Sequence, residues 1–430
     1  MFAFCPELCY TVKKNPLKGD AFMALFFHID VNSAYLSWTA VRRLAEGDSE
    51  DLRLIPSAVG GNREKRHGII LAKSPLAKAC GVRTGEPVAA ALKKCPGLVL
   101  VPPDFELYDQ NSRAFMDILR RFSPQVEQFS IDEAFMDMTG MQLLYQDPVT
   151  AAVQIRDTIY SELGFTVNVG ISVNRLLAKM ASDFEKPGKI HTLFPEEIRE
   201  KMWPLPIGEL YMAGHSAEAV LTGLGIRTIG DLARSSPATI RAHLKKHGET
   251  LWKYANGQDD GQLFSQKTKD KEIGNSTTIP YDVESADTAK NILLSLCETV
   301  ATRLRHESLR AACVSVRITD YNFVSRTHQK LLPVTTNVTS ELFCAVSALF
   351  DEMWDGTPIR LLGVQTSRLT KDAYRQYNLF DREKFDKQEK LDSCIDEIRR
   401  RFGEDSIKRA SFINNKTYHM IGGISKNKRR

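Results

Sequence analysis

The first half of the chain alternates short apolar runs with longer stretches in which apolar residues recur at helical spacing. The pattern predicts strands at 25–29, within 125–138 and at 165–172, and helices at 108–122 and 149–163. The first strand brings Asp30 to its carboxyl end, and the segment 125–138 forms two strands that meet at Asp132 and Glu133. This alternation of strand and helix predicts an α/β layer.

The second half of the chain changes character twice. Residues 204–257 contain short helical patterns separated by Gly and Pro, which predicts a small helical domain, and the polar stretch 262–271 predicts a linker. Beyond it the pattern predicts strands at 272–280, 313–321, 325–334 and 359–369, and helices at 286–307 and 338–354. The order βαββαβ predicts a four-stranded sheet with two helices on one face.

Alternation within 313–321 directs two sets of side chains to opposite faces of that sheet. The apolar set faces the helices and the polar set faces outward: Val314, Val316 and Ile318 in the first, and Ser315, Arg317 and Thr319 in the second. A polar, partly basic face is suited to a phosphate backbone. A merely solvated sheet face has the same pattern, so both interpretations stay open.

The composition is that of an ordinary globular protein, with 43% hydrophobic and 26% charged residues over 430 positions. This length has room for two to four domains of about 100–200 residues. No apolar run approaches the roughly 18 residues of a membrane helix, so we expect no membrane association. The eight cysteines are scattered without zinc-ligand spacing, and residues 1–22 lack a secretory signal. We therefore expect a cytoplasmic protein.

The net charge of +5 is concentrated at the C-terminal end of the chain. Residues 370–430 contain sixteen Lys and Arg against ten Asp and Glu. Such a basic tail indicates an anionic partner such as nucleic acid, although a solvated end has the same composition.

Three acidic residues at predicted strand ends carry the strongest chemical signal. Adjacent Asp132 and Glu133 cannot both face one side of a regular strand, but a turn between strands removes that restriction. If the strand ending at Asp30 lies beside this turn, three carboxylates converge, and their burial requires cations. Two Mg²⁺ ions about 3.5–4 Å apart suit oxygen ligands and promote in-line displacement at phosphorus. Taken singly, each of these residues is more often a solvated turn residue.

Two segments around these acids resemble motifs of a known family. The first is Phe27-His28-Ile29-Asp30 followed by Asn32-Ser33-Ala34-Tyr35, and the second runs from Phe129 to Asp137. Both resemble the Y-family DNA polymerases, in particular the bacterial polymerase IV and UmuC-like members, over about residues 24–420. The resemblance implies a multidomain α/β and α+β fold shaped as a right hand. Its parts are a palm, small fingers, a helical thumb with a helix-hairpin-helix-like segment, and a βαββαβ little finger.

The resemblance also divides the chain into domains. An N-terminal extension, expected to be disordered, precedes a palm whose two parts flank the fingers. The implied bounds are 1–23 for the extension, 24–36 and 103–190 for the palm, 37–102 for the fingers, 191–261 for the thumb, 262–271 for the linker, 272–370 for the little finger and 371–430 for the basic tail, with a UmuC-type catalytic region at 26–210.

By this resemblance Asp30, Asp132 and Glu133 are the catalytic residues. Together with the Val31 carbonyl they would hold two Mg²⁺ ions. Tyr35 occupies the position of the family's steric gate, whose ring fills the space that a ribose 2′-hydroxyl needs. The alternative for Tyr35 is a core aromatic on a helix. No metal is assigned to Asn32, because many relatives have Asp there.

The resemblance also implies contacts to the triphosphate of the incoming nucleotide. Lys179 would reach it from the palm helix, although an ordinary solvated lysine is the alternative. The segment 73–81 resembles the fingers motif in which a Tyr and a basic residue bind phosphates. Lys78 takes the basic position, but Pro75 replaces the Tyr and offers neither hydroxyl nor amide donor. Triphosphate binding would then be weaker, or another group substitutes.

Two further segments resemble contact sites. Gly214–Ser216 resembles the thumb hairpin that points backbone N–H groups at a DNA phosphate, with Ser216 in place of the second glycine and available as an N-cap. Gln376, Leu379 and Phe380 lie in a peptide that resembles the segment with which bacterial polymerases bind the sliding clamp. Beyond it, one helix face is predicted to pack against the protein, namely Leu391, Ile395, Ile398 and Phe402.

Together these features predict a monomeric, low-fidelity, DNA-directed DNA polymerase of translesion synthesis. Its partners would be primer–template DNA, deoxynucleoside triphosphates and a sliding clamp. A relative that binds DNA or organises repair without polymerising is the first alternative; Pro75 and the altered hairpin favour it, whereas the acidic triad, Tyr35 and Lys179 oppose it. The second is another nucleotidyl-transfer enzyme on a similar palm, such as a cyclase, which would need neither thumb nor clamp peptide.

Overall fold

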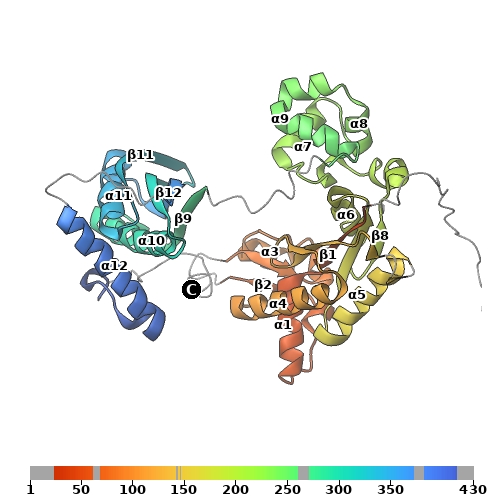
Figure 1. Ribbon diagram of the computed structural model, residues 1–430, viewed down its shortest axis with the longest axis horizontal. Helices are drawn as coiled ribbons and strands as arrows, with labels where there is room; N and C mark the ends of the chain where they lie inside the picture. The colour runs from red at the N-terminus through yellow and green to blue at the C-terminus, as the bar shows by residue number, and fades with distance from the viewer. Residues whose placement is uncertain are drawn as a thin grey trace, which may run out of the picture. The chain divides into compact units, whose positions relative to one another are not determined.

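The computed structural model describes residues 24–61, 68–141, 144–145, 147–259, 271–371 and 382–413. They form two compact units, one from the segment up to Ala34 with 110–259, the other from 35–109 with 271–413. Figure 1 labels the elements of both units. The first unit is discontinuous in sequence, because 35–109 is inserted into it.

A five-stranded mixed sheet forms the centre of the first unit. Its order is β5-β6-β1-β7-β8, with β1 in the middle between two antiparallel neighbours. The strands are β1 (Phe26–Val31), β5 (Val126–Gln128), β6 (Glu133–Asp137), β7 (Val167–Ser172) and β8 (Ile190–Thr192). Phe27 and Ile29 of β1 are fully buried, which explains why the strand is an apolar run. The predicted strand before Asp30 and the predicted hairpin are confirmed.

Two helices cover opposite faces of this sheet. α5 (Pro148–Leu163) begins after the N-cap Asp147 and packs beside Phe27. α6 (Arg175–Ser182) packs on β1 and β7 from the side to which His28 points. Because neighbouring strand residues alternate between faces, Phe27 and His28 belong to the two different layers.

Short helices form the rest of the first unit and gather together in Figure 1. They are η5 (Ile207–Glu209), α7 (His215–Gly223), α8 (Ile229–Arg234) and α9 (Pro237–Ala255). α7 begins at His215 with Gly214 as its N-cap, and no side chain caps it. The prediction that Ser216 is available as an N-cap is therefore wrong: Ser216 is the second helical residue, two positions after the cap.

The inserted segment of the second unit contains a three-stranded sheet of order β3-β2-β4. Its elements are α1 (Ala34–Ala45), β2 (Ser57–Gly60), β3 (Ile70–Lys73), α2 (Pro75–Ala79), α3 (Val88–Lys94), β4 (Val99–Val101) and α4 (Phe105–Phe122). Leu36 and Ala40 of α1 bury their side chains against Val59 and Val101 of this sheet. A small apolar core thus holds α1 in place directly after β1.

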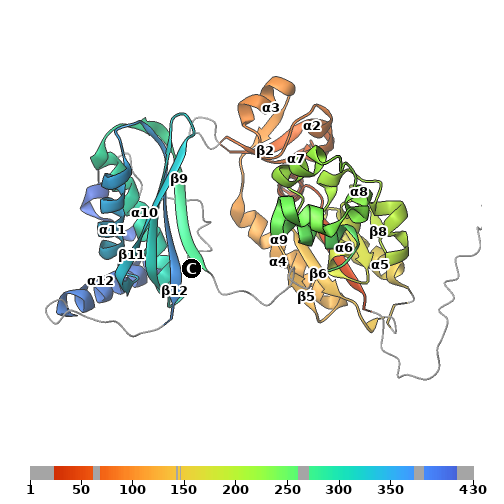
Figure 2. The ribbon, with the colours of Figure 1, turned by 90° about the horizontal axis from the view of Figure 1, so that it is seen from above.

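The second sheet of this unit has four antiparallel strands in the order β11-β10-β12-β9. The elements are β9 (Glu272–Val283), α10 (Ala286–His306), β10 (Arg310–Asp320), β11 (Ser325–Thr336), α11 (Thr339–Met353) and β12 (Ile359–Thr370). Val314, Val316 and Ile318 are buried in one core with α10 and α11. Figure 2 shows these two helices on one side of the sheet. Arg317 is exposed on the other face. The predicted βαββαβ order is confirmed. Of the predicted outward residues, Arg317 is exposed and Ser315 is half-buried, but Thr319 is buried at 7% exposure, because its hydroxyl packs 2.8 Å from that of Ser325 on β11.

α12 (Arg382–Phe402) follows this sheet, and its buried face is charged. Asp392 and Arg399 are 6% and 8% exposed, whereas Leu391 and Phe402 are 59% and 75% exposed. The prediction that Leu391, Ile395, Ile398 and Phe402 form a packing face is therefore wrong at both ends. Across the described ranges, no helix is both long enough and apolar enough to cross a lipid bilayer.

Candidate active site

Asp30, Asp132 and Glu133 meet where β1 ends and β6 begins. Asp30 is the last residue but one of β1, and its cross-strand partner is Glu133, the first residue of β6. The Asp132 carbonyl accepts a hydrogen bond of 3.0 Å from the Val31 N–H, which ties the turn to the end of β1. Directly paired strand residues place their Cβ atoms about 4.5–5.5 Å apart. The register thus brings the three predicted acids to one end of the sheet.

Asp30 is buried at 7% exposure and contacts the ammonium group of Lys186. Burial raises the pKa of Asp30 to about 6, because Lys186 offsets the lost hydration only in part and Glu133 adds repulsion. Lys186 also pairs with Asp183 at 2.8 Å. Burial alone would lower the pKa of Lys186, but the Asp30 and Asp183 carboxylates outweigh burial and raise it.

Glu133 is held by cationic and polar groups on its other side. Its Oε2 lies 3.0 Å from Lys179 Nζ and 3.6 Å from His28 Nε2. Burial would raise the pKa of Glu133, but His28 and Lys179 together lower it to about 2. Lys179 is 8% exposed, and its ammonium lies 5.5 Å from the ring centre of Phe129 and 5.7 Å from that of Tyr211. Glu133 is therefore ionised at neutral pH.

Asp132 lies in the turn and has fewer partners than Glu133. The Ser130 hydroxyl donates a hydrogen bond of 2.6 Å to its Oδ1. Burial nevertheless raises the pKa of Asp132, and the adjacent Glu133 carboxylate adds to the rise. Two of the three acids thus lack enough positive charge for their burial.

The carboxylates of this sheet end are paired with ammonium groups and offer oxygen ligands to a divalent metal. Within the described segments, no three side chains of His, Cys, Asp or Glu are already gathered as metal ligands. Instead an ammonium group stands beside Asp30 and another beside Glu133. The raised pKa values of Asp30 and Asp132 show that further positive charge would be favourable. Hard carboxylate oxygens and the Val31 carbonyl are ligands that Mg²⁺ accepts, so the residues fit this ion.

The close approach of α6 to the sheet places Lys179 beside Glu133. Asn174 caps the helix by accepting a hydrogen bond of 2.8 Å from the Leu177 N–H. At Gly170 of β7, an added Cβ would lie only 2.0 Å from the Ala178 carbonyl oxygen. Only a residue without a Cβ lets the helix lie this close to the strand. The glycine therefore sets the distance between α6 and the carboxylates.

Asn32, to which no metal was assigned, makes structural hydrogen bonds. Its side-chain oxygen accepts a 2.8 Å bond from the Gly188 N–H, and its amide donates a 3.1 Å bond to Asn168. The residue is buried at 7% exposure. These contacts link the end of β1 to the loop after Lys186.

Tyr35 lies in the first turn of α1 and is half-buried in an aromatic cluster. Its ring stacks on Tyr108 with centroids 4.6 Å apart and meets Phe105 edge-on at 6.5 Å. Thr39 donates a hydrogen bond to the Tyr35 carbonyl at 2.7 Å, and its hydroxyl lies 3.1 Å from that of Tyr108. The ring of Tyr35 is thus held in a fixed orientation on a rigid helix.

The fingers-like segment places its basic groups around α2. Pro75 is the first residue of this helix, and Ser74 caps it by accepting a 3.1 Å hydrogen bond from the Ala77 N–H. Proline suits this position, because its missing N–H would have no helical partner there. Lys78 is exposed. Burial lowers the pKa of Lys73, and the nearby Lys78 lowers it further, so two cations stand close together.

Other predicted contact residues lie apart from the carboxylates or outside the described residues. Gly214 and Ser216 are exposed at the start of α7. Gln376, Leu379 and Phe380, the predicted clamp-binding residues, belong to the segment 372–381, which lies outside the described residues. The structure therefore brings Lys179 together with the acids, whereas Tyr35 and Lys78 belong to the other unit.

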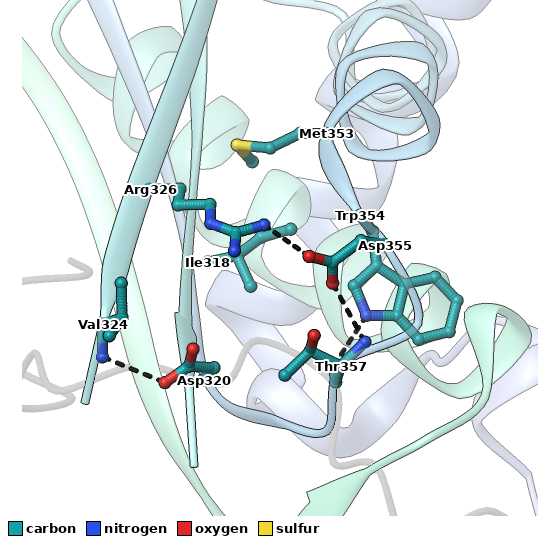
Figure 3. Close-up of a pocket in the computed structure, with 8 residues that line it drawn as sticks. All are labelled: Ile318, Asp320, Val324, Arg326, Met353, Trp354, Asp355 and Thr357. Carbon is teal, nitrogen blue, oxygen red and sulfur yellow. Dashed lines mark hydrogen bonds and ion pairs between the residues drawn. The ribbon is translucent and has the colours of Figure 1, made fainter. Parts of the chain in front are cut away.

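A small hollow near the end of β10 does not compete as a functional site. Figure 3 shows it between Asp320, Arg326 and Asp355, with a free volume of about 10 Å³. That volume holds about one water molecule. Arg326 is already paired with Asp355 at 2.6 Å, and Asp320 accepts a 2.9 Å hydrogen bond from the Val324 N–H. The polar groups that line the hollow are therefore used in contacts within the protein, where the end of β10 and the start of β11 meet the end of α11.

Sequence reasoning missed Lys186, His28 and Ser182. Lys186 contacts Asp30 across 156 positions, and His28 contacts Ser182 across 154, so neither pairing has a local pattern. A usable signal existed for Lys186, which follows Asp183 by three residues just after α6. His28 carries the weaker signal of a polar residue inside an apolar strand.

The chain is similar to known proteins over most of its length. Residues 29–183 match the impB/mucB/samB family, and residues 270–379 match the C-terminal domain of the same family. A protein named DNA polymerase IV from Clostridium acetobutylicum is 44% identical over 389 residues, which cover 90% of this chain and 98% of the relative. Another of that name, from Acetivibrio thermocellus, is 35% identical over 92% of this chain and 99% of its own length.

A solved structure supports the same fold. A Y-family DNA polymerase chimera superposes with a TM-score of 0.69, at 19% sequence identity. The match covers 81% of this chain and 100% of the other. At this level of identity the similarity establishes the fold, and the predicted palm, fingers, thumb and little-finger architecture is confirmed as a fold class.

Proposed function

The chain belongs to the impB/mucB/samB family of Y-family DNA polymerases, and on that premise we propose that it is a low-fidelity DNA polymerase that extends primers past damaged template bases. The observation that carries the proposal is the meeting of Asp30, Asp132 and Glu133 at one sheet end. Burial raises the pKa of two of these acids, Asp30 and Asp132, so additional positive charge would stabilise their ionised forms.

We infer that Asp30, Asp132, Glu133 and the Val31 carbonyl hold two Mg²⁺ ions. Bound Mg²⁺ supplies a more acidic primer hydroxyl and neutralises charge on the departing pyrophosphate. The protein's residues align the carboxylates through the β1–β6 register and through the Val31 to Asp132 hydrogen bond. With such an ion bound, Lys186 would give up its contact with Asp30, which a charge on a flexible stem can do.

Lysines are proposed to bind the triphosphate. Lys186 is 37% exposed at its side chain and already lies beside the acids, so it is well placed to bind phosphate once Asp30 has another partner. Lys179 remains a predicted contact by resemblance, although its ammonium is held by Glu133. At α2, Lys78 is the predicted contact, and the neighbouring Lys73 is a candidate substitute for the hydroxyl that Pro75 lacks.

DNA contacts are proposed on both units. The outward face of the four-stranded sheet, with Ser315 and Arg317, presents polar and basic groups suited to a phosphate backbone. Gly214 and Ser216 at the start of α7 offer backbone N–H groups to a second phosphate. The domain bounds given by the sequence, the clamp-binding role of Gln376, Leu379 and Phe380, a monomeric state and a cytoplasmic location stand as parts of this proposal.

Primer extension tests the proposal directly. The wild type with Mg²⁺ should extend a labelled primer on a template, including one with an abasic site, and Asp132→Ala should not. Binding of both proteins to primer–template DNA, measured by fluorescence anisotropy, is the control. A wild type that binds DNA but does not extend would instead support the non-polymerising relative.

Tyr35→Ala tests the steric gate separately. The variant should incorporate ribonucleotides at least about tenfold better relative to deoxynucleotides, because the half-buried ring that would meet the 2′-hydroxyl is gone. Tyr108→Phe, which keeps the ring stacked beneath Tyr35, is the matched control. Unchanged sugar selection in Tyr35→Ala would remove the gate assignment.

A further inference from the structure

His28 is a fully buried polar side chain in the middle of β1, and no step proposed above uses it. It is 0% exposed and lies two residues before Asp30 on the same face of the strand. Its cross-strand partner in β7 is Gly170, the residue that admits α6 close to the sheet. The imidazole therefore fills the space between β1 and α6, behind the carboxylates.

The two ring nitrogens of His28 face different partners. Nδ1 lies 2.7 Å from the Ser182 hydroxyl, and Nε2 lies 3.6 Å from Glu133 Oε2. Among the residues that the structure describes, no atom stands within hydrogen-bond distance of Nε2, so Glu133 is its nearest candidate partner. A shift of a few tenths of an ångström closes this gap to a hydrogen bond.

The hydrogen on the imidazole can be placed by elimination. If Nδ1 alone carried hydrogen, the lone pair of Nε2 would face the Glu133 carboxylate, and two acceptors would repel each other in a buried site. The Ser182 hydroxyl lies 2.8 Å from the Lys179 carbonyl, but it can turn its one hydrogen toward Nδ1 instead. Hydrogen on Nε2 removes this repulsion, and the Ser182 hydroxyl then donates to Nδ1 rather than to the Lys179 carbonyl.

We propose that His28 is a positioning residue that holds the Glu133 carboxylate through Nε2–H, with Ser182 fixing the ring through Nδ1. The inference rests on the proposed polymerase function, because it assigns His28 a part in that site. Lys179 contacts the same Oε2 at 3.0 Å, so His28 and Lys179 together determine where this carboxylate points. Groups that hydrogen-bond to metal ligands fix the orientation of those ligands, and replacing such a group commonly lowers activity by about 10–100-fold.

Packing alone is the competing explanation. The imidazole also lies against Phe135, with ring centres 4.5 Å apart. A residue that serves only to fill this space could be replaced by another flat ring without loss of activity. Positioning instead requires a hydrogen-bond donor at the place of Nε2.

Three substitutions separate these explanations. In His28→Gln the side-chain amide reaches the position of Nε2, whereas in His28→Asn it stops at the position of Nδ1. His28→Phe keeps the flat ring and removes both nitrogens. The readouts are kcat for primer extension and the Mg²⁺ requirement, measured both as the concentration for half-maximal rate and as the concentration for half-maximal Mg²⁺ binding without nucleotide. Thermal unfolding is the control for folding.

We expect His28→Gln to retain kcat within about threefold, and His28→Asn and His28→Phe to lose about 10–100-fold with a higher Mg²⁺ requirement. Equal losses in the Gln and Asn variants, or full activity in the Phe variant, would overturn the proposal. Should a His28 variant fail to fold, Ser182→Ala tests the same contact from the other side. It should raise the Mg²⁺ requirement in the same direction, and an unchanged requirement would contradict the proposal.

The wild type separates this inference from the proposed function. A wild type without primer extension would refute the polymerase function. An active wild type that Asp132→Ala inactivates, with His28 variants indistinguishable from it, would refute only the role of His28.

Discussion

Each unit of the protein buries acidic side chains against cations, but the partners differ. In the first unit Asp30 and Glu133 meet Lys186 and Lys179. In the second, Glu298 of α10 is 4% exposed and faces two arginines. Glu298 Oε1 lies 2.6 Å from Arg409 Nε, and its Oε2 lies 3.5 Å from Arg399 of α12. Asp392 of α12 pairs with Arg305 at 3.1 Å and accepts a 2.8 Å hydrogen bond from the Thr339 N–H. We call this group of contacts, which holds α12 against α10, the α12 joint.

The acids at the sheet end are paired with lysines, whereas the acids that hold α12 in place are paired with arginines, and this difference suits the two clusters to different roles. A guanidinium is planar and always charged, and its several donors fix a carboxylate in one geometry. An ammonium is a compact charge on a flexible stem, and it can leave. The pKa of Asp30 is raised to about 6, which shows that its lysine does not compensate for its burial. The arginines of the α12 joint are therefore suited to a permanent contact, whereas the lysines at the sheet end can be replaced by other cations.

The largest effect should come from neutralising the sheet end. Asp132→Asn should lower kcat by about 10³-fold or more, because a neutral amide cannot supply the charge that the metals require. Glu298→Gln, a matched change in the other unit, should leave kcat within about threefold. Steady-state primer extension measures both, and the comparison fails if the two variants lose activity equally while folded.

The next effect should appear in the stability of the α12 joint. Glu298→Ala leaves Arg399 buried without its carboxylate, which costs about 3 kcal/mol or more and corresponds to about 100-fold faster local exchange. Hydrogen exchange of peptides from α10 and α12 reports this opening. Protection unchanged from the wild type would mean that the joint is held by something other than its ion pairs.

A smaller effect of opposite sign is expected at Asp30. Its pKa is about 6 in the folded protein and near 3.8 in the unfolded chain, so the ionised carboxylate destabilises the fold at pH 7. Asp30→Asn should therefore raise the free energy of unfolding by up to about 3 kcal/mol at pH 7 without metal. This gain should shrink as the pH falls from 6 toward 4, because protonation removes the same penalty in the wild type.

Urea unfolding in a chelator at several pH values tests this expectation. Asp183→Asn removes the more exposed carboxylate beside Lys186, whose side chain is 48% exposed, and should give no such gain. If Asp30→Asn is less stable than the wild type, Lys186 compensates the carboxylate after all, and the contrast between the two units disappears.

The smallest effect should come from an ion pair at the surface that joins the helix of Glu298 to α11. Lys290 of α10 contacts Asp351 of α11 at 2.7 Å, with side chains 31% and 54% exposed. Asp351→Asn should cost about 0.5 kcal/mol or less and should cost nothing at high salt. Denaturant unfolding at two salt concentrations measures it. A cost equal to that of Glu298→Ala would show that burial does not decide the strength of these pairs.

Much of the fold could be predicted because it depends on local patterns. The βαββαβ order follows from period-two and helical spacing, and each predicted element from 272 to 369 is present with ends moved by a few residues. The strand before Asp30 and the turn at Asp132 were visible because a buried strand is an apolar run that stops where the chain turns. The acids were therefore placed correctly at strand ends.

The remaining features depend on residues far apart in the sequence. The apolar spacing from Leu391 to Phe402 predicted a packing face, yet the partners of this helix are charged residues about 90 positions earlier, such as Arg305 with Asp396 at 91. That pairing turns the helix so that Asp392 and Arg399 face inward. Lys186 was missed for the same reason, because its position beside Asp30 depends on the register of two strands and on the loop after α6.

The close packing at Gly170 restricts the substitutions that are possible at the centre of the sheet. Every other amino acid begins with the same added carbon, and that carbon would lie 2.0 Å from the Ala178 oxygen and 2.4 Å from the Ser182 nitrogen. No other amino acid is therefore expected to be tolerated at position 170, even though Gly170 takes no part in the proposed chemistry. A random-mutagenesis library selected for activity should therefore be depleted of every amino-acid substitution at this position, Gly170→Ala included.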